Sequence, residues 1–196
     1  IIIGVTQSFD SYQDLVKQAR DAGIGVYSND NSVIDGVISN ATMDNAEAAQ
    51  EIMEQVAADH PDGLNYSVFE LAMSEVVTLR ADKAKAYADE NDAFKLLDSI
   101  DLASTGDLNT AGFTIAQTWL QQYGDDLQYI FCSADTPALS AAEAIIQAGD
   151  ANGDNMEIYP QRFSSEVHIL STIRVLQPHD MSGYRRSAGQ RFKSWR

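Results

Sequence analysis

The sequence predicts an α/β fold in which a parallel sheet carries helices on both faces. Short apolar segments rich in Ile, Val and Phe alternate along the chain with longer segments whose apolar residues recur at helical spacing. The connectors are short and contain turn formers such as Gly, Pro, Asn and Asp. Strands that alternate with helices pair in parallel, because each crossover helix returns the chain to the same end of the sheet. With 196 residues, the chain can form one good core or two small lobes.

The first part of the chain predicts three short strands and one helix. The opening "IIIGV" predicts a buried strand because it is short, apolar and β-branched. A helix follows, with Asp10 or Ser11 as its expected N-cap and Gly23 as its end. Its apolar face carries Tyr12, Leu15, Val16 and Ala19. The second and third strands are expected at residues 24–28 and 36–39.

The remaining elements continue the alternation. A long helix is expected to begin at Thr42 or Asp44 and to end at the Pro-Asp-Gly turn of residues 61–63. Strands are then expected at residues 65–72, 97–103, 127–133 and 156–160. Helices are expected between them, at residues 75–91, 109–124 and 137–149. No helix or strand is predicted after Pro160.

The charged residues are unevenly distributed. The formal net charge is −16, yet residues 1–160 hold 27 acidic and 6 basic side chains, whereas residues 161–196 hold 2 and 7. The acidic body argues against nucleic acid as a partner, since phosphate contacts need clustered Lys and Arg. Three interpretations of the basic tail stay open: a reading frame that shifted near residues 156–161, an arm that binds nucleic acid or membrane, and a short genuine extension.

Targeting signals are scarce in this sequence. The chain opens without Met and without a basic n-region, so we expect the true N-terminus to lie upstream. No run approaches the ~20 apolar residues of a membrane span, and we therefore expect no membrane insertion. The single Cys132 excludes an internal disulfide and leaves the redox compartment open.

Motifs of enzymes and cofactor sites are absent from the sequence. There is no GxGxxG, no P-loop and no GxSxG elbow, so we expect neither an enzyme nor a cofactor. The three histidines are scattered, and Cys132 predicts a small buried residue rather than a nucleophile. The segment 150–157 partly mimics a calcium loop, but Asn155 and Gln161 replace the required Gly and Glu. No metal site is expected.

Polar side chains gather where three predicted strands or loops lead toward the next helix. They are Asp30 and Asn31 after the second strand, Asp107 and Asn109 before the helix at 109–124, and Asp135 after the strand at 127–133. The carboxyl ends of parallel strands converge on one edge of a sheet, where ligands bind. Carboxylates and amides suit paired hydroxyl groups, which favours a sugar or polyol. The alternative is that each residue is only a helix cap or a turn residue, and for Asp135 this question stays open.

Over residues 1–160 the ordered pattern resembles the sugar-binding periplasmic proteins of the ribose-binding type. The segments that carry the resemblance are "ARDAGIGVYSNDN", "ISNATMDNAEAAQEIMEQVA" and "TGDLNTAGFTIAQTWLQQYGDDLQYIFCSADTPALSAAEAIIQAG". The resemblance implies a partial periplasmic-binding-protein type I fold, with Rossmann-like lobes and a sugar in the cleft between them. It also implies that lobe closure presents the protein to an ABC transporter permease.

The resemblance also implies a set of ligand-binding residues. Asp30 and Asn31 would bind sugar hydroxyls, Arg80 would be the cleft arginine with Lys83 in reserve, and Asp135 would be the second residue of the family's Asn-Asp pair. Ala134 stands where that pair has its Asn, and Leu108 falls near the cleft aromatic, so an amide and a stacking ring are lost. The expected ligand-binding set is Asp30, Asn31, Arg80, Asp107, Asn109 and Asp135.

These observations predict residues 1–38 as a remnant of a first lobe, 39–160 as the second lobe and 161–196 as an atypical basic tail. The expected function is binding of a sugar or polyol for ABC-transporter uptake, in the periplasm or outside the cell. Alternatives are the effector-binding domain of a LacI-type repressor, a small α/β enzyme, and a truncated fragment without function. With the first lobe's opening strand–helix units absent, sheet edge and apolar surface would be exposed, so we expect poor solubility as a monomer.

Overall fold

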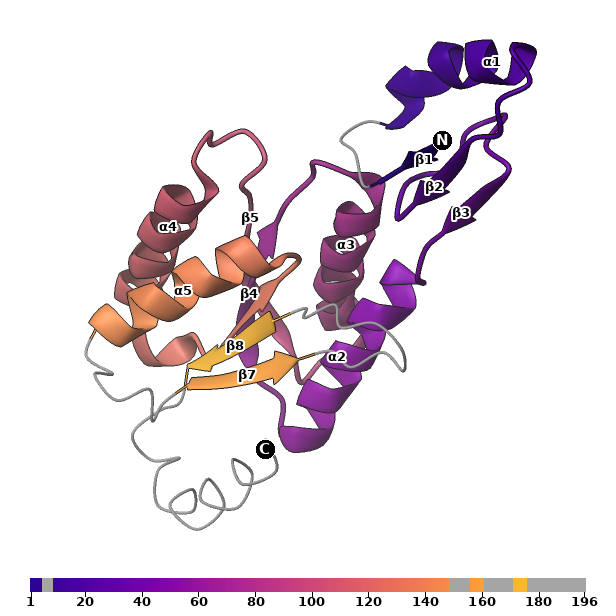
Figure 1. Ribbon diagram of the computed structural model, residues 1–196. Coiled ribbons are helices and arrows are strands. Elements are labelled where there is room, and N and C mark those ends of the chain that lie inside the picture. Colours follow the sequence, from indigo (N-terminus) through magenta and orange to yellow (C-terminus); the bar gives the residue numbers. More distant parts are fainter. Residues whose placement is uncertain (5–8, 149–155, 161–170, 176–196) are drawn as a thin grey trace, which may run out of the picture.

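The computed structural model describes residues 1–4, 9–148, 156–160 and 171–175. Two sheets organise these residues, a three-stranded sheet in the order β1-β2-β3 and a five-stranded sheet in the order β5-β4-β6-β8-β7 (Figure 1). We call residues 1–4 and 9–41 the small unit, and residues 45–148 with β7 and β8 the large lobe. The α/β class predicted from the sequence is confirmed.

The small unit is a parallel sheet with one helix packed on it. It contains β1 (Ile2–Ile3), the 3₁₀ turn η1 (Phe9–Tyr12), α1 (Gln13–Asp21), β2 (Tyr27–Asn29) and β3 (Ser39–Ala41). Its core consists of Phe9, Val16, Val26 and Ile34. β2 and β3 each begin three residues later than the pattern predicts, and the whole of β3 lies beyond the boundary expected at residue 38. The expected cap by Asp10 or Ser11 is wrong, because η1 precedes α1 and Tyr12 takes the N-cap position without a side-chain hydrogen bond.

The expectation that the first strand is buried is wrong for its leading residues. Ile1 is 62% and Ile2 is 79% exposed, whereas Ile3 packs against the core of the small unit. Side chains of a strand alternate between the two faces of the sheet. Within the described residues, the apolar core lies on the α1 face, so Ile2 and its register partner Tyr27 remain exposed on the other face.

The large lobe follows the predicted alternation closely. Its helices are α2 (Asn45–Asp59), α3 (Glu75–Glu90), α4 (Leu108–Tyr123) with the short turn η2 (Gly124–Asp126), and α5 (Asp135–Gln147). β4 (Asn65–Glu70) lies between β5 (Lys95–Asp101) and β6 (Tyr129–Cys132) and pairs in parallel with both. Asp44 caps α2 by accepting a hydrogen bond from the Glu47 amide at 2.9 Å, which satisfies one of the free N–H groups of the first turn.

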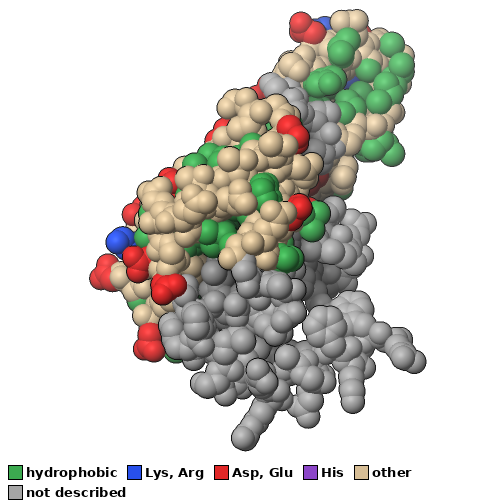
Figure 2. All heavy atoms as spheres, turned by 90° about the vertical axis from the view of Figure 1, so that its left-hand side faces the viewer, with side chains coloured by type: hydrophobic (Ala, Val, Ile, Leu, Met, Phe, Trp, Pro, Cys, Tyr) green, Lys and Arg blue, Asp and Glu red, His purple; other side chains and the backbone are tan. Residues whose placement is uncertain are grey.

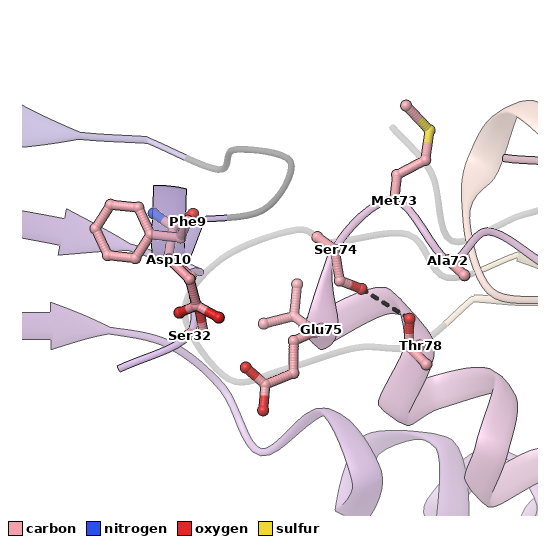
Figure 3. A pocket seen from close by; sticks show the side chains of 10 residues that line it. Phe9, Asp10, Ser32, Ala72, Met73, Ser74, Glu75 and Thr78 are labelled. Carbon is pink, nitrogen blue, oxygen red and sulfur yellow. Dashed lines mark hydrogen bonds between the residues drawn. The ribbon is translucent and has the colours of Figure 1, made fainter. Parts of the chain in front are cut away.

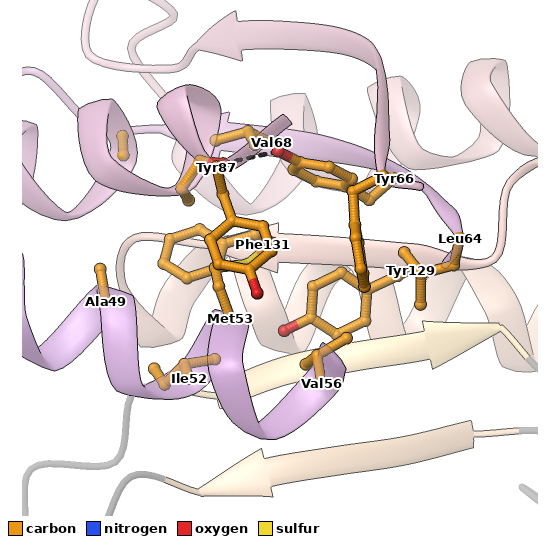
Figure 4. Packing of buried hydrophobic residues seen from close by; sticks show 13 residues of the cluster. Ala49, Ile52, Met53, Val56, Leu64, Tyr66, Val68, Tyr87, Tyr129 and Phe131 are labelled. Atoms are coloured by element: carbon orange, nitrogen blue, oxygen red, sulfur yellow. Dashed lines mark hydrogen bonds between the residues drawn. The ribbon is translucent and has the colours of Figure 1, made fainter. Parts of the chain in front are cut away.

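Both faces of the central strands are covered by helices. On one face, Tyr66, Tyr129 and Phe131 pack against α2 and α3, and the Tyr66 hydroxyl donates to the Ala84 carbonyl at 2.6 Å (Figure 4). On the other face, α4 and α5 cover a second core in which Trp119 stacks on Phe69 with ring centroids 4.5 Å apart. The Trp119 indole N–H donates to Asp98 Oδ2 at 2.8 Å, so this tryptophan is a satisfied core residue.

The far side of the large sheet differs from the expected parallel arrangement. β8 (Ser171–Val175) lies between β6 and β7 (Met156–Pro160) and is antiparallel to both. The expectation of no element after Pro160 is therefore wrong. The sequence of β8 contains Thr172, Ile173 and Val175, which are β-branched residues with high strand propensity, and the free edge of β6 offers hydrogen-bond partners whatever the charge of the flanking chain. The remainder of the tail and most of the calcium-like segment lie outside the described residues.

Candidate functional site

A cavity of about 250 Å³ lies between the small unit and the large lobe (Figure 3). The small unit contributes a wall at the start of η1 and another just after β2. The large lobe contributes the turn that follows β4 and the first turn of α3. The lining residues are Phe9, Asp10, Asn31 and Ser32 on one side, and Ala72, Met73, Ser74, Glu75, Val76 and Thr78 on the other. The cavity therefore lies at the carboxyl ends of β2 and β4, where α/β folds place their ligands.

The wall of the large lobe is the uncapped start of α3. Ser74 has the extended backbone of an N-cap, with φ −146° and ψ 152°, but its side chain makes no capping hydrogen bond. Its hydroxyl oxygen is buried and has no partner among the described residues. Its carbonyl accepts the Thr78 hydroxyl at 3.0 Å. This wall presents hydroxyl groups and the Glu75 carboxylate, which suits a neutral ligand with several hydroxyls.

Arg80 lies one turn further along α3 and is only 8% exposed. Its Nε donates to Asn45 Oδ1 at 2.7 Å, its Nη1 donates to the Ser133 carbonyl at 3.3 Å, and its Nη2 lies 3.9 Å from Met43 Sδ. A guanidinium has five N–H donors. These contacts leave one donor on each terminal nitrogen without a partner among the described residues.

Two carboxylates balance the buried charge of Arg80 from a distance. Burial lowers the pKa of the Arg80 guanidinium, and the negative charges of Asp30 and Asp135 act against that shift. Neither carboxylate forms an ion pair of 4 Å or less with Arg80 in the part of the chain that the structure describes. The charges of Asp30 and Asp135 therefore act on Arg80 without a direct ion pair.

Asp30 and Asn31 follow β2 but differ in their surroundings. Asp30 has a left-handed backbone with φ +54°, and its Oδ1 accepts the Thr42 hydroxyl at 2.9 Å. Asn31 is 4% exposed, and its Nδ2 donates to the Gly4 carbonyl at 2.9 Å and to the Asn29 carbonyl at 3.0 Å. The Asn31 amide therefore ties β1 to β2, and Asn31 contributes to the cavity wall as a structural residue as well.

The structure answers the capping question for Asp135. Asp135 is the first residue of α5, whereas the N-cap position is held by Ala134, which cannot cap. The Asp135 carboxylate is exposed, and no hydrogen bond to it is formed within the described residues. A carboxylate in the first helical turn is favourable next to the helix dipole, but it remains available to a ligand.

Asn31 is the only one of the six expected ligand-binding residues that lines the cavity. The other five, Asp30, Arg80, Asp107, Asn109 and Asp135, are not among its lining residues. Asp107 is the N-cap of α4, since its Oδ1 accepts from the Asn109 amide at 3.0 Å and its Oδ2 accepts the Thr110 hydroxyl at 2.7 Å. The Asn109 side chain accepts the Ser140 hydroxyl at 3.5 Å, which connects α4 to α5. Lys83 pairs with Glu90 at 3.3 Å on the same helix. Each of these side chains has a local structural partner, and none lines the cavity.

Several lining residues were not expected from the sequence. Phe9 and Asp10 belong to η1, and Ser74, Glu75 and Thr78 belong to the start of α3. One signal was available, because Ser74 directly precedes a helical pattern at the end of a predicted strand, the same position that singled out Asp135. Phe9 carried no such signal, since an aromatic residue in a loop is equally compatible with core packing.

Other classes of site find no support among the described residues. No group of three or more His, Cys, Asp or Glu side chains is arranged to hold a metal ion there. Cys132 is fully buried, and burial raises the pKa of its thiol, which confirms a core residue rather than a nucleophile. Within the same residues, no helix combines the length and the apolar composition that a membrane crossing requires.

The described residues form two α/β units with a cavity between them. Residues 1–163 match the family described as the periplasmic binding protein domain, and the chain belongs to this family. Members of this class bind a solute rather than transform it, which confirms the expectation of a binding protein instead of an enzyme. No curated protein sequence matches the chain.

Solved structures with a similar fold have low sequence identity. A 5-methylthioribose transporter solute binding protein from Thermotoga lettingae TMO, in complex with 5-methylthioribose, has a TM-score of 0.66 and 19% identity over 77% of this chain and 48% of its own. An ABC transporter solute binding protein from Bacillus halodurans C-125 with bound myo-inositol has a TM-score of 0.62 and 20% identity over 76% and 51%. An ABC sugar transporter subunit from Rhodobacter sphaeroides 2.4.1 has a TM-score of 0.63 and 22% identity over 76% of this chain and 53% of its own.

These structures confirm the type I periplasmic-binding-protein fold and its partial extent. The chain spans about half the length of each of these proteins. None of the three is described as a transcriptional repressor, so the repressor alternative gains no support from them.

Proposed function

We propose that the chain binds a sugar or polyol in the cavity between the small unit and the large lobe. One observation carries the proposal: Arg80 is buried in the helix whose first turn lines the cavity, it holds unpaired N–H donors, and the charges of Asp30 and Asp135 act on it without forming ion pairs. A hydroxyl group can accept from the guanidinium and donate to a carboxylate at the same time. A polyol carries several such hydroxyl groups on adjacent carbons, whereas a ligand with a single hydroxyl group offers only one.

The residues that line the cavity also favour a sugar or polyol as the ligand. Asn31 lines the cavity and is adjacent to Asp30, and Thr78 lines it two residues before Arg80. The lining adds the hydroxyls of Ser32, Ser74 and Thr78. Two of the similar structures carry 5-methylthioribose and myo-inositol, both rich in hydroxyl groups. Asp107 and Asn109 have less support as ligand-binding residues, since capping and the contact with α5 already account for their positions.

The cellular role that we propose is delivery of this ligand to an ABC transporter permease, in the periplasm or outside the cell. The family and the transporter proteins among the similar structures support this role. Sequencing the coding DNA on both sides of this chain tests it. An upstream signal sequence is expected, whereas an upstream helix-turn-helix would move the interpretation to a repressor.

Binding is tested by isothermal titration and thermal shift of the full chain with a panel of monosaccharides and polyols that includes myo-inositol and 5-methylthioribose. We expect at least one compound to raise the melting temperature of the wild type. Asp135→Ala is expected to weaken its affinity by about ten- to a hundredfold, because a hydrogen bond to a charged group is worth about 1.5–3 kcal/mol.

The matched control is Glu143→Ala, which removes the same charge from an exposed position of the same helix. It is expected to bind like the wild type. A panel without any binder, or equal affinities of the Asp135→Ala variant and the wild type, would contradict the proposed site.

A further inference from the structure

The residue that follows β6 carries a buried hydroxyl group without a partner. Ser133 extends the pairing of β6 with β4, because its amide donates to the Phe69 carbonyl at 3.1 Å. Ser133 is fully buried, and its Oγ accepts and donates no hydrogen bond among the described residues. Buried hydroxyl groups in folded proteins usually have a partner, and one without a partner lowers stability. The carboxyl end of β6 therefore holds an unused donor and acceptor.

Arg80 lies next to Ser133 and has unused donors of its own. Its Nη1 donates to the Ser133 carbonyl at 3.3 Å. Side chains alternate along a strand, so the Ser133 side chain lies on the sheet face of Phe131, which α2 and α3 cover. Arg80 belongs to α3, and one N–H group on each of its terminal nitrogens has no partner in the described part of the chain. Two buried side chains with unused hydrogen-bonding groups are therefore neighbours.

The terminal nitrogens of Arg80 are held less firmly than Nε. Nε donates to Asn45 Oδ1 at 2.7 Å, whereas the terminal nitrogens lie 3.3 Å from the Ser133 carbonyl and 3.9 Å from Met43 Sδ. Hydrogen bonds weaken as they lengthen beyond their usual range. The guanidinium is therefore anchored at Nε, and its terminal nitrogens can move toward an incoming acceptor at little cost.

A neutral hydroxyl group matches the unused groups of both side chains. Its oxygen can accept from the Arg80 guanidinium, and its hydrogen can be donated to Ser133 Oγ. A carboxylate or phosphate oxygen could accept from both side chains as well. However, the negative charges of Asp30 and Asp135 already act on Arg80 and disfavour a further anion beside it.

We propose that Ser133 determines specificity in the site, and that its hydroxyl group and the free N–H donors of Arg80 together bind one hydroxyl group of the sugar or polyol. This inference rests on the proposed function and adds a residue to it. Ser133 does not line the cavity, so the bound hydroxyl group lies at the end of the ligand that is next to Arg80. In the free chain the Ser133 hydroxyl stays unpaired, which lowers the stability of the free chain.

The first test compares two buried serines by isothermal titration of the full chain with myo-inositol and 5-methylthioribose. Ser67 on β4 is the matched control, because it is also fully buried and its Oγ also has no partner among the described residues. Its neighbours Tyr66 and Val68 belong to the core under α2 and α3, so Ser67 lies on the opposite face from Arg80. We expect Ser133→Ala to weaken binding about tenfold and Ser67→Ala to bind like the wild type. Equal affinities of Ser133→Ala and the wild type would overturn the inference and leave the proposed function intact.

The second test identifies the hydroxyl group of the ligand. Monodeoxy analogues of the compound that binds each lack one hydroxyl group. For the wild type, we expect one analogue to bind about tenfold more weakly than the parent compound. For Ser133→Ala, the same analogue should lose much less, because groups in direct contact have non-additive effects. Additive losses for every analogue would show that Ser133 does not contact the ligand, and would overturn the inference.

The third test needs no ligand and distinguishes a ligand hydroxyl from a resident water molecule as the partner of Ser133. Removal of an unpaired buried hydroxyl is stabilising, so we expect Ser133→Ala to raise the melting temperature of the free chain by about 2–4 °C, as Ser67→Ala does. A lower melting temperature for Ser133→Ala would show that a water molecule already pairs with the hydroxyl, and would overturn the inference. If Ser133→Ala does not fold, Ser133→Cys serves instead in all three tests, since a thiol fills the site but is a weak donor and acceptor. If neither compound binds the wild type, the proposed function is contradicted for these ligands, and the melting temperature decides the inference by itself.

Discussion

The small unit and the large lobe differ in how completely their sheets bury apolar side chains. In the large lobe, the central strands β4 and β6 bury alternate side chains on both faces, under α2 and α3 on one side and α4 and α5 on the other. In the small unit, the described residues form an apolar core on the α1 face alone. Ile2, Tyr27, Val33 and Ile38 are between 44% and 87% exposed there, and hydrophobic side chains gather on this unit in Figure 2.

This difference shows where stability and function reside. The folding free energy comes chiefly from the large lobe, because burial of apolar surface is the dominant favourable term in folding. The proposed site needs both parts, because Arg80 and Asp135 belong to the large lobe and Asp30 to the small unit. One wall of the cavity is therefore carried by a well-packed lobe and the other by a sheet with one open face.

The sharpest test of this contrast is a pair of core and surface substitutions. Phe131→Ala removes a fully buried ring from the core of the large lobe, and we expect it to lower the free energy of unfolding by about 3–5 kcal/mol. Val33→Ala in the small unit removes a side chain that is 87% exposed, and we expect a change within about 0.5 kcal/mol. Urea unfolding followed by circular dichroism measures both. Similar decreases in the free energy of unfolding for the two variants would contradict the difference in packing between the large lobe and the small unit.

The open face of the small sheet predicts self-association. Ile2 and Tyr27 are register partners on neighbouring strands, and both are exposed. We expect the wild type to be poorly soluble as a monomer. Each of Ile2→Lys and Tyr27→Lys is expected to weaken association about tenfold, because full burial of such a side chain contributes about 1.5–3 kcal/mol. Sedimentation velocity over a concentration series measures the effect.

A control in the large lobe locates the association surface. Leu139 on α5 is 70% exposed, and Leu139→Lys is expected to leave the association unchanged. A wild-type chain that remains a monodisperse monomer and unfolds in a sharp, reversible transition would overturn the prediction. Equal effects of Leu139→Lys and Ile2→Lys would show that association is not a property of the small sheet.

The same contrast explains how far the sequence predicts the fold. The helices of the large lobe were predicted within a few residues, since each has a long apolar periodicity and α2 has the expected cap at Asp44. The strands of the small unit were displaced, because three-residue strands have too few side chains to fix a register. β8 was missed because a five-residue segment carries little signal of its own, and its pairing depends on the strand edge that β6 offers.

The site was predicted less completely, for a different reason. The resemblance placed Asp30, Arg80 and Asp135 in one cleft, and in the structure the charges of both carboxylates act on the arginine without forming ion pairs with it. Whether they bind a ligand remains a prediction. Sequence could not show that the Asn31 amide would be consumed by carbonyls of Gly4 and Asn29, since that depends on where β1 ends relative to β2. Nor did it distinguish capping from binding at Asp107, because both roles place a carboxylate before a helix.

The smallest predicted effect concerns the stability that the Asp107 cap gives to α4 in the large lobe, compared with α1 of the small unit, which has no side-chain cap. Hydrogen bonds from the Thr110 hydroxyl and from the Asn109 and Thr110 amides hold the pKa of Asp107 below its ordinary value. The folded state therefore favours the charged form, and its stabilising contribution is fully present above the ordinary aspartate pKa of about 4. That contribution is lost as the pH falls through the lower pKa of the folded state. We expect Asp107→Ala to reduce the free energy of unfolding slightly at pH 7, and the difference from the wild type to vanish in strong acid.

Two comparisons make this test specific. Asp107→Asn keeps an acceptor oxygen at the N-cap but does not titrate, so its stability relative to the Ala variant should be independent of pH. In the small unit, α1 begins at Tyr12 without a side-chain cap, so Tyr12→Ala should produce no acid-dependent difference. Chemical denaturation at pH 7 and at several lower pH values measures all of these variants. If the difference between wild type and Asp107→Ala persists unchanged in acid, the Asp107 side chain stabilises the start of α4 through hydrogen bonds that do not depend on its charge.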